Sequence, residues 1–230
     1  MKRILFPLLL LTLASCAIPI DEPPPPTVLP SVTPQAALIP SPTFTAIPTL
    51  TLPPVLTQTP IPTQPPNFCA DVRGTELIKS FSKAVASKDG ALLASIVSPA
   101  DGMDVRYYRD GKVINYDVEH AKFVFETTYQ ADWGLSFGSG EPTIGSFQDV
   151  ILPTLEQVFT PNSLIVCGQL QTGGATYIPE WPYSEMDYYS VYFPGSDEFS
   201  GLDWQTWAMG MEYLDGKPYI AALARYVWEP

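Results

Sequence analysis

The chain has 230 residues, 26 of them proline, and a formal net charge of −12. Nucleic acid and anionic lipid headgroups repel so acidic a chain, so we exclude nucleic acid as a partner. Cys69, Cys167 and the single distant histidine do not make the four ligands of a typical metal site, and the sequence contains no phosphate loop or dinucleotide fingerprint. We therefore expect no metal and no cofactor.

Residues 1–15 have the pattern of a secretory signal peptide. A cationic start, Met1-Lys2-Arg3, precedes an apolar run over 4–13. That run of about ten residues is half the roughly twenty that span a bilayer. The segment Leu13-Ala14-Ser15-Cys16 then places small residues before a cysteine. It resembles the lipobox of bacterial lipoproteins. The alternatives are an ordinary signal peptide with a chance cysteine, or a membrane anchor.

The lipobox resemblance implies cleavage before Cys16 and acylation of that cysteine. The mature net charge is then −14, two more negative than −12, because Lys2 and Arg3 are lost. Two or more acyl chains anchor a protein stably. We expect the membrane as a partner through this lipid. The expected location is the cell envelope, on the outer face of the cytoplasmic membrane or in the outer membrane.

After the anchor, residues 16–66 form a linker that contains most of the chain's prolines, with threonines between them. Proline removes backbone donors and extends its neighbours, so neither ladders nor helices are expected. At about 3.1 Å per residue, an extended linker of this length reaches on the order of 150 Å. A ligand for proline-binding domains and a glycosylated stalk are the alternatives to a spacer.

Residues 67–230 have the length of one domain, and we predict a single α+β fold there. If Cys16 is acylated, Cys69 and Cys167 remain as an even pair in an oxidising compartment. We predict a disulfide between them. Two buried free thiols are the alternative.

The first half of this domain shows helical spacing and one hairpin signal. Leu77 to Val85 predicts a helix capped by Thr75 and stopped by Gly90, followed by a helix over 91–97. Asp110-Gly111 predicts a hairpin that pairs Tyr107 with Ile114 and Tyr108 with Val113. Asp117 is expected to open a helix over 118–128. After a glycine-containing loop over 134–145, Ser146 and Asp149 predict another helix start, with Pro153 kinking or limiting that helix.

The second half predicts strands over 164–170, 187–193, 203–214 and 218–228. A two-residue turn at Asp215-Gly216 would place Trp207 opposite Ala224, Met209 opposite Ala222 and Met211 opposite Ile220. Both faces of this hairpin are apolar, so we expect a cover on each. Either a second layer or a partner subunit, as in a homodimer through the sheet face, could supply it.

Helices and a hairpin followed by an antiparallel meander resemble the nuclear transport factor 2-like fold. In that family, helices and a hairpin pack on a curved antiparallel sheet to make a cone. The segment 111–125 resembles its hairpin-to-helix step, whereas the helix after Ser146 is an extra element. The resemblance implies a concave pocket, which family members use for binding, dimerisation or catalysis.

Two features are candidates for a binding site. One is a proline-held aromatic stretch that contains Tyr177, Trp181, Tyr183 and Tyr188. Such side chains can bind a glycan, a small molecule or a protein, or simply pack. The other is Arg225, which lies in an apolar strand. It is expected either to pair with an acid such as Glu212 or Glu126, or to point into a pocket.

Catalytic residues are not evident in the sequence. His120, the only histidine, lies near Asp117 on a predicted helix and is expected on the surface, and no nucleophile elbow is present. The acids at Asp101 and Asp104 do not have calcium-loop spacing and predict a turn. We expect a non-catalytic binding module. The alternative is a small-molecule enzyme that places an acid of raised pKa in the cone pocket.

Overall fold

The computed structural model describes residues 67–230. Within that range, none of the helices combines the length and the apolar character needed to cross a membrane. The helical elements are η1 (Phe68–Ala70), α1 (Val72–Ser87), α2 (Gly90–Ile96), α3 (Val118–Ala121), η2 (Phe147–Ile151), α4 (Leu152–Val158) and η3 (Asp197–Phe199). The strands are β1 (Met103–Arg106), β2 (Val113–Tyr116), β3 (Ala131–Leu135), β4 (Pro142–Gly145), β5 (Leu164–Cys167), β6 (Asp187–Phe193), β7 (Gln205–Leu214) and β8 (Lys217–Val227).

Six of these strands form one sheet in the order β2-β1-β8-β7-β6-β5, and β3 pairs with β4 in a separate hairpin. Strands β1 and β8 run parallel, while the other neighbours are antiparallel. The predicted α+β class, with helices and a hairpin on a curved, mainly antiparallel sheet, is confirmed. The parallel pair between β1 and β8 was not predicted.

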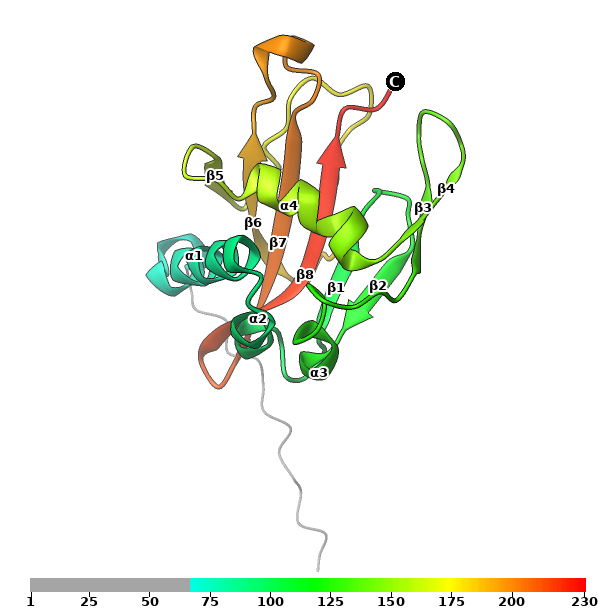
Figure 1. Cartoon of the computed structure of the whole chain (residues 1–230). Coiled ribbons are helices and arrows are strands. Elements are labelled where there is room, and N and C mark those ends of the chain that lie inside the picture. The colour runs from blue at the N-terminus through cyan, green and yellow to red at the C-terminus, as the bar shows by residue number, and fades with distance from the viewer. Residues whose placement is uncertain (1–66) are drawn as a thin grey trace, which may run out of the picture. The chain divides into compact units, whose positions relative to one another are not determined.

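One face of the sheet, here called the inner face, carries the helices and most of the core. Figure 1 shows α4 lying across β6, β7 and β8. Trp207 and Met209 on β7 are fully buried in the same apolar cluster as Phe81 of α1 and Leu155 of α4. The space between helices and sheet is therefore occupied by core side chains.

The opposite, outer face is covered by the chain's own segment 168–186, here called the covering segment. A second apolar cluster joins buried Trp204, Ala208 and Tyr226 to Tyr177 and Trp181 of this segment. The expected cover on both faces is thus confirmed, and on the outer face it comes from the same chain. Homodimerisation through a sheet face stays a prediction.

The N-cap of α1 and the first residue of α2 differ from the predicted ones. Asp71, rather than Thr75, caps α1 by accepting a hydrogen bond from the Arg73 amide. The helix ends at Lys88 in a left-handed conformation, and Gly90 begins α2. A Cβ at Gly90 would lie 1.9 Å from the Lys122 carbonyl oxygen. This glycine therefore permits close packing and is not a helix stop.

The predicted β1–β2 hairpin is present with another register. Val105 pairs with Ile114 and Arg106 with Val113, so the pairing of Tyr107 and Tyr108 was wrong. The connection is long because the Arg106 guanidinium donates to the carbonyl oxygens of Arg109 and Gly111, each at 3.2 Å. These bonds hold a wide loop where a two-residue turn was expected.

The two capped starts at Asp117 and Ser146 are confirmed, although the helices that follow differ in length. Asp117 accepts from the His120 amide, but α3 lasts only one turn. Ser146 accepts from the Asp149 amide and opens a π-helical turn that continues into α4, with Pro153 in the first turn of α4. The proline is accommodated there because its missing donor is not required.

The predicted loop over 134–145 instead belongs largely to the β3–β4 hairpin. Trp133 on β3 is fully buried, and its indole Nε1 donates to the Gly145 carbonyl oxygen at 3.0 Å. The alternation that would reveal these strands is weak in this glycine-rich stretch, so the hairpin was missed.

The β7–β8 turn at Asp215-Gly216 is confirmed, with positive φ at both residues. Met211 pairs with Ile220 as predicted, but the register shifts between Gly210 and Met211. Beyond this bulge Trp207 faces Arg225 and Met209 faces Leu223. The predicted pairings of Trp207 and Met209 were wrong because a uniform register cannot anticipate a bulge.

Candidate functional site

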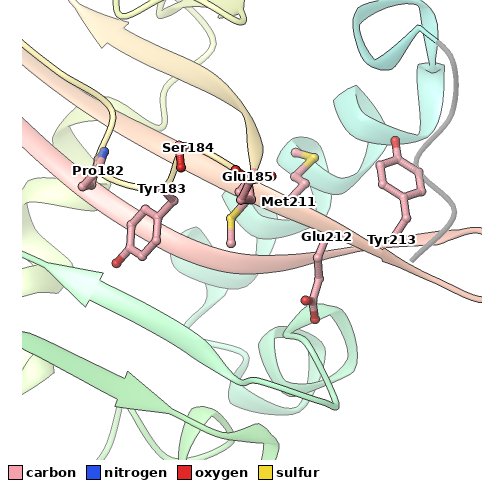
Figure 2. Close-up of a pocket in the computed structure, with 8 residues that line it drawn as sticks. Pro182, Tyr183, Ser184, Glu185, Met211, Glu212 and Tyr213 are labelled. Atoms are coloured by element: carbon pink, nitrogen blue, oxygen red, sulfur yellow. The ribbon is translucent and has the colours of Figure 1, made fainter. Parts of the chain in front are cut away.

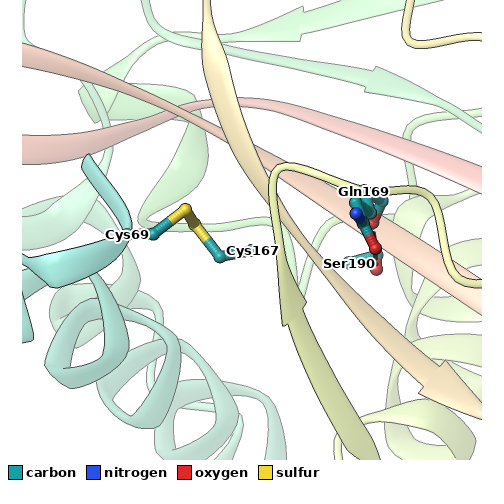
Figure 3. Close-up of a disulfide and its surroundings, with 4 residues drawn as sticks. All are labelled: Cys69, Cys167, Gln169 and Ser190. Carbon is teal, nitrogen blue, oxygen red and sulfur yellow. Dashed lines mark hydrogen bonds between the residues drawn. A yellow bond between two sulfur atoms is a disulfide. The ribbon is translucent and has the colours of Figure 1, made fainter. Parts of the chain in front are cut away.

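The predicted disulfide joins Cys69 in η1 to Cys167 at the end of β5 (Figure 3). Just after it, the Ser190 hydroxyl donates to the Gln169 carbonyl oxygen at 2.7 Å. The start of the covering segment is thus fixed beside β6. The predicted lipidation at Cys16 lies outside the described residues.

Most of the predicted aromatic stretch packs on the outer sheet face. Trp181 stacks on Tyr188 with ring centroids 4.6 Å apart, and its Nε1 donates to the Met186 carbonyl oxygen at 2.8 Å. The Tyr177 hydroxyl donates to the Val227 carbonyl oxygen at 3.0 Å. These contacts hold the covering segment on the sheet and give the three aromatic residues a packing role.

Gly210 allows this segment to approach β7 closely. A Cβ there would lie 2.3 Å from the Met186 sulfur and 2.7 Å from Cζ2 of Trp181. Any larger residue would push the covering segment outward, so a single glycine fixes where the adjoining side chains lie.

Tyr183 differs from its aromatic neighbours because its hydroxyl reaches a carboxylate. It donates to Oδ2 of Asp104 on β1 at 3.1 Å. Burial, followed by the nearby negative charge of Asp104, raises the pKa of Tyr183 to about 12. The ring is half-buried and lines an opening between the covering segment and β7.

This opening, here called the Glu212 pocket, has a volume of about 440 Å³. That volume is within the range of pockets that hold small ligands. Figure 2 draws its lining residues, which come from the two segments. It is lined by Pro182, Tyr183, Ser184, Glu185, Met186, Met211, Glu212 and Tyr213.

Glu212 is the half-buried acid of this pocket. The hydroxyl of Ser98, which is 1% exposed, donates to Oε1 of Glu212. The same hydroxyl oxygen accepts from the backbone amides of Ala100 and Asp101. Burial first, and then the neighbouring Asp101 carboxylate, raise the pKa of Glu212 to about 7. The carboxyl group can therefore gain or lose a proton near neutral pH.

At the other end of the pocket, Tyr213 is held by an ion pair. Its hydroxyl donates to Oδ2 of Asp71 at 2.9 Å, and the Arg73 guanidinium binds the same carboxylate at 2.7 Å. The hydrogen bond and charge of Arg73 keep the pKa of Asp71 well below its usual range, against the effect of burial. The charge of Arg73 is thus balanced beside the pocket.

Arg225 on β8 does not line the Glu212 pocket and lies against the Tyr107 ring. Its Nε donates to Oε1 of Gln205 at 2.8 Å, and its guanidinium carbon lies 4.5 Å from the Tyr107 ring centroid. Burial lowers its pKa. Within residues 67–230 it forms no ion pair, so the predicted pairing with Glu212 or Glu126 was wrong.

His120 is exposed and its Nδ1 lies 2.8 Å from Oδ1 of Asp117, as the sequence predicted for a surface residue. In the part of the chain that the structure describes, no three histidine, cysteine or acidic side chains gather as a metal site would require.

Sequence reasoning placed Tyr183 among the candidates but treated Glu212 only as a partner for Arg225. The available signal was an acid between Met211 and Tyr213 in a strand that is otherwise apolar. The other wall of the pocket is formed by the covering segment, whose Met186 packs against Gly210 of β7. No local pattern reveals that contact.

No protein-family model and no curated protein matches the chain. Among solved structures, one named for the nuclear transport factor 2 fold is 12% identical, with a TM-score of 0.33, covering 68% of this chain and 100% of that one. A nuclear transport factor 2-like protein of unknown function from Silicibacter pomeroyi DSS-3 is 9% identical, with a TM-score of 0.30, covering 66% and 91%.

A protein from Xanthomonas campestris, described as a calcium/calmodulin dependent protein kinase II association domain, is 15% identical. Its TM-score is 0.26, and the match covers 75% of this chain and 97% of that one. We draw no functional argument from likenesses at these TM-scores. The α+β class rests on the strand order and helices described above.

Proposed function

We propose that the chain is a lipid-anchored, extracytoplasmic binding module that takes a small ligand in the Glu212 pocket. The observation that supports binding is the cavity of about 440 Å³ between the covering segment and β7. Its walls are mainly apolar, and a few polar groups converge on it, as in typical ligand sites. The lipobox-like sequence at Cys16 supports the anchor.

The pocket lies outside the cone interior, where the sequence placed an alternative enzyme site. Core side chains such as Trp207 and Leu155 occupy that interior. A carboxyl pKa near neutral is nevertheless what general acid–base catalysis requires, so a small-molecule enzyme that uses Glu212 is the second candidate.

Methionine methyl resonances can test ligand binding in this pocket. Met186 and Met211 line the pocket, and Met211 also belongs to the core cluster, whereas Met103 and Met209 are 0% exposed in that cluster and do not line the pocket. We expect members of a small-molecule fragment set to shift the first two methyl signals more than the last two. The measurement uses the full chain carrying Cys16→Ser, with its disulfide formed and its methionine methyls labelled.

Ser184→Trp supplies a blocking variant, since Ser184 is exposed on the pocket wall. It should abolish the shifts, while Ser139→Trp, an exposed serine in the β3–β4 loop, should preserve them. If no fragment shifts the Met186 and Met211 signals selectively, the proposed binding function is wrong.

The anchor has a separate test. Metabolic labelling with a radioactive fatty acid should mark the wild-type chain and leave Cys16→Ser unlabelled. Equal labelling of the two chains would remove the lipid anchor from the proposal.

A further inference from the structure

The Glu212 pocket combines apolar walls with an excess of negative charge. Of its eight lining residues, Glu185 and Glu212 are acidic and none is basic. The carboxylate of Asp101 adds to the negative field at Glu212. An anionic ligand would be repelled here, and a neutral ligand would leave the half-buried Glu212 carboxylate without a counter-ion.

Within residues 67–230, the cations near the pocket form no ion pair with Glu212. Arg73 binds Asp71 beside Tyr213. The positive charge of Arg106 acts on the Tyr183 phenol, as does the opposing charge of Asp104. The Arg106 guanidinium donates to the carbonyl oxygens of Arg109 and Gly111. Lys217 lies 4.5 Å from the ring centroid of Tyr219, the strand partner of Glu212. Neither of these cations forms an ion pair with Glu212.

The side chains around Glu212 suit a cation attached to an apolar body. Met186 supplies a soft, polarisable thioether, and Tyr183 supplies an aromatic ring whose face attracts cations. The Ser98 hydroxyl donates to one carboxylate oxygen of Glu212, and Glu212 itself lines the pocket.

We propose that the ligand class of the Glu212 pocket is a hydrophobic primary amine, with its ammonium group paired with Glu212 and its apolar body against Met186 and Tyr183. This inference rests on the proposed binding function, which it deepens. The ammonium would supply the positive partner that the described residues do not give to Glu212.

The pairing has a consequence for pH. Binding of an ammonium group favours the ionised carboxylate, so the complex forms with release of a proton where Glu212 is still protonated. The groups around Glu212 are Ser98 and Asp101 from the turn after α2, Glu185 and Tyr183 from the covering segment, Tyr213 on β7, and Tyr219 with Lys217 on β8. Affinity should therefore rise between pH 5.5 and pH 8.

Three probes of one shape separate charge from apolar contact: 4-phenylbutylamine, 4-phenylbutanol and 4-phenylbutyrate. They would be titrated into the full chain carrying Cys16→Ser, with the methyl signals of Met186 and Met211 as the readout. At pH 8 we expect the amine to bind at least ten-fold more tightly than the alcohol, and the carboxylate to bind most weakly. At pH 5.5 the preference for the amine should fall several-fold.

Glu212→Gln keeps the shape and removes the charge. It should abolish the preference for the amine and leave the affinity for the alcohol within about two-fold. Glu141→Gln changes an exposed acid in the β3–β4 loop and should keep the wild-type preference for the amine.

If the alcohol binds as tightly as the amine, or if Glu212→Gln retains the preference, the amine class is wrong and the pocket remains a binding site. If none of the three probes shifts the Met186 and Met211 signals, the amine proposal falls. If the fragment set also fails to shift those signals, the binding function falls with it.

Discussion

Gly210 shows how one residue sets the geometry of the candidate site. Its missing side chain leaves room for Met186 and Trp181, which lie where a Cβ would otherwise be. The Trp181–Tyr188 stack and the wall of the Glu212 pocket both depend on that approach. A glycine inside a strand indicates that another segment approaches it closely, but the sequence does not identify that segment.

Gly210→Ala should therefore destabilise the protein and alter the pocket. We expect a loss of about 1–3 kcal/mol, the typical cost of forcing extra volume into a packed layer. The measurement is urea unfolding followed by tryptophan fluorescence. Gly174→Ala, in the covering segment, is the control, because no atom lies within 4 Å of the added Cβ. Equal stability of the two variants would contradict the packing role of Gly210.

Glu212 gives a pH-dependent prediction. Its pKa is raised in the folded protein to about 7, mainly by burial, so the folded state holds a proton that the unfolded chain releases at lower pH. Between the unfolded pKa, about 4.3, and pH 7, stability therefore falls as pH rises. Below that range ionisation of Glu212 does not lower the stability of the folded state, and above it the full loss of stability is present.

Glu212→Gln should thus raise the free energy of unfolding at pH 8 by on the order of 1 kcal/mol, after discounting for partial solvent exposure of the group. At pH 4 the variant and the wild type should unfold alike. Chemical denaturation at both pH values measures the difference, with Glu141→Gln as the control. A stabilisation that does not depend on pH would show that burial of the charge is not its cause.

Among the helices and strands, local signals predicted starts better than lengths or registers. Asp117, Ser146 and the Asp215-Gly216 turn each act within one turn of chain, and all three were predicted correctly. The short α3, the bulge beside Gly210 and the parallel β1–β8 pair depend on contacts between distant segments. Periodicity and capping contain no information about such contacts.

In the candidate site, too, local features were predictable from the sequence and contacts between distant segments were not. The aromatic stretch was visible in the sequence, and packing was one of the two interpretations given for it. Glu212 reaches its Ser98 partner across 114 residues of chain. Only the folded sheet brings the two together, so no spacing in the sequence could have identified the pair.

The Ser146 cap offers a test at the level of a single helix. Its side chain is 1% exposed, accepts from the Asp149 amide at 3.1 Å and donates to the Asp149 carboxylate at 2.7 Å. Ser146→Ala should cost about 1–2 kcal/mol because a buried helix start loses its cap. Thermal and urea unfolding measure this. Ser87→Ala, at an exposed helix end, should change stability far less, and a similar loss in both would argue against a specific cap.

For the molecule as a whole, the Cys69–Cys167 disulfide encloses a large part of the described chain. The sequence separation is 98 residues. In the chain-entropy model a loop of about a hundred residues contributes roughly 4–5 kcal/mol by restricting the unfolded state.

Replacing both cysteines by alanine should lower the free energy of unfolding by an amount of that order. Reduction of the wild-type protein should reproduce the loss, and a reductant should have no effect on the double variant. The comparison is made by urea unfolding with and without reductant. Unchanged unfolding of the wild type in reductant would contradict a stabilising disulfide.

The same bond determines how the domain would respond to mechanical tension. A pull between the chain preceding Asn67 and Pro230 passes from Cys69 through the disulfide to the end of β5. The bond closes residues 70–166 into a loop, so the pull cannot lengthen them, and α1 to α4 lie inside that loop. Reduction would release about 300 Å of extended chain at roughly 3.3 Å per residue. In the oxidised protein only residues 168–230 can be drawn out, and these form the Glu212 pocket. Tension would therefore extend the segment that forms the pocket, whereas α1 to α4 could not be drawn out until the bond is reduced.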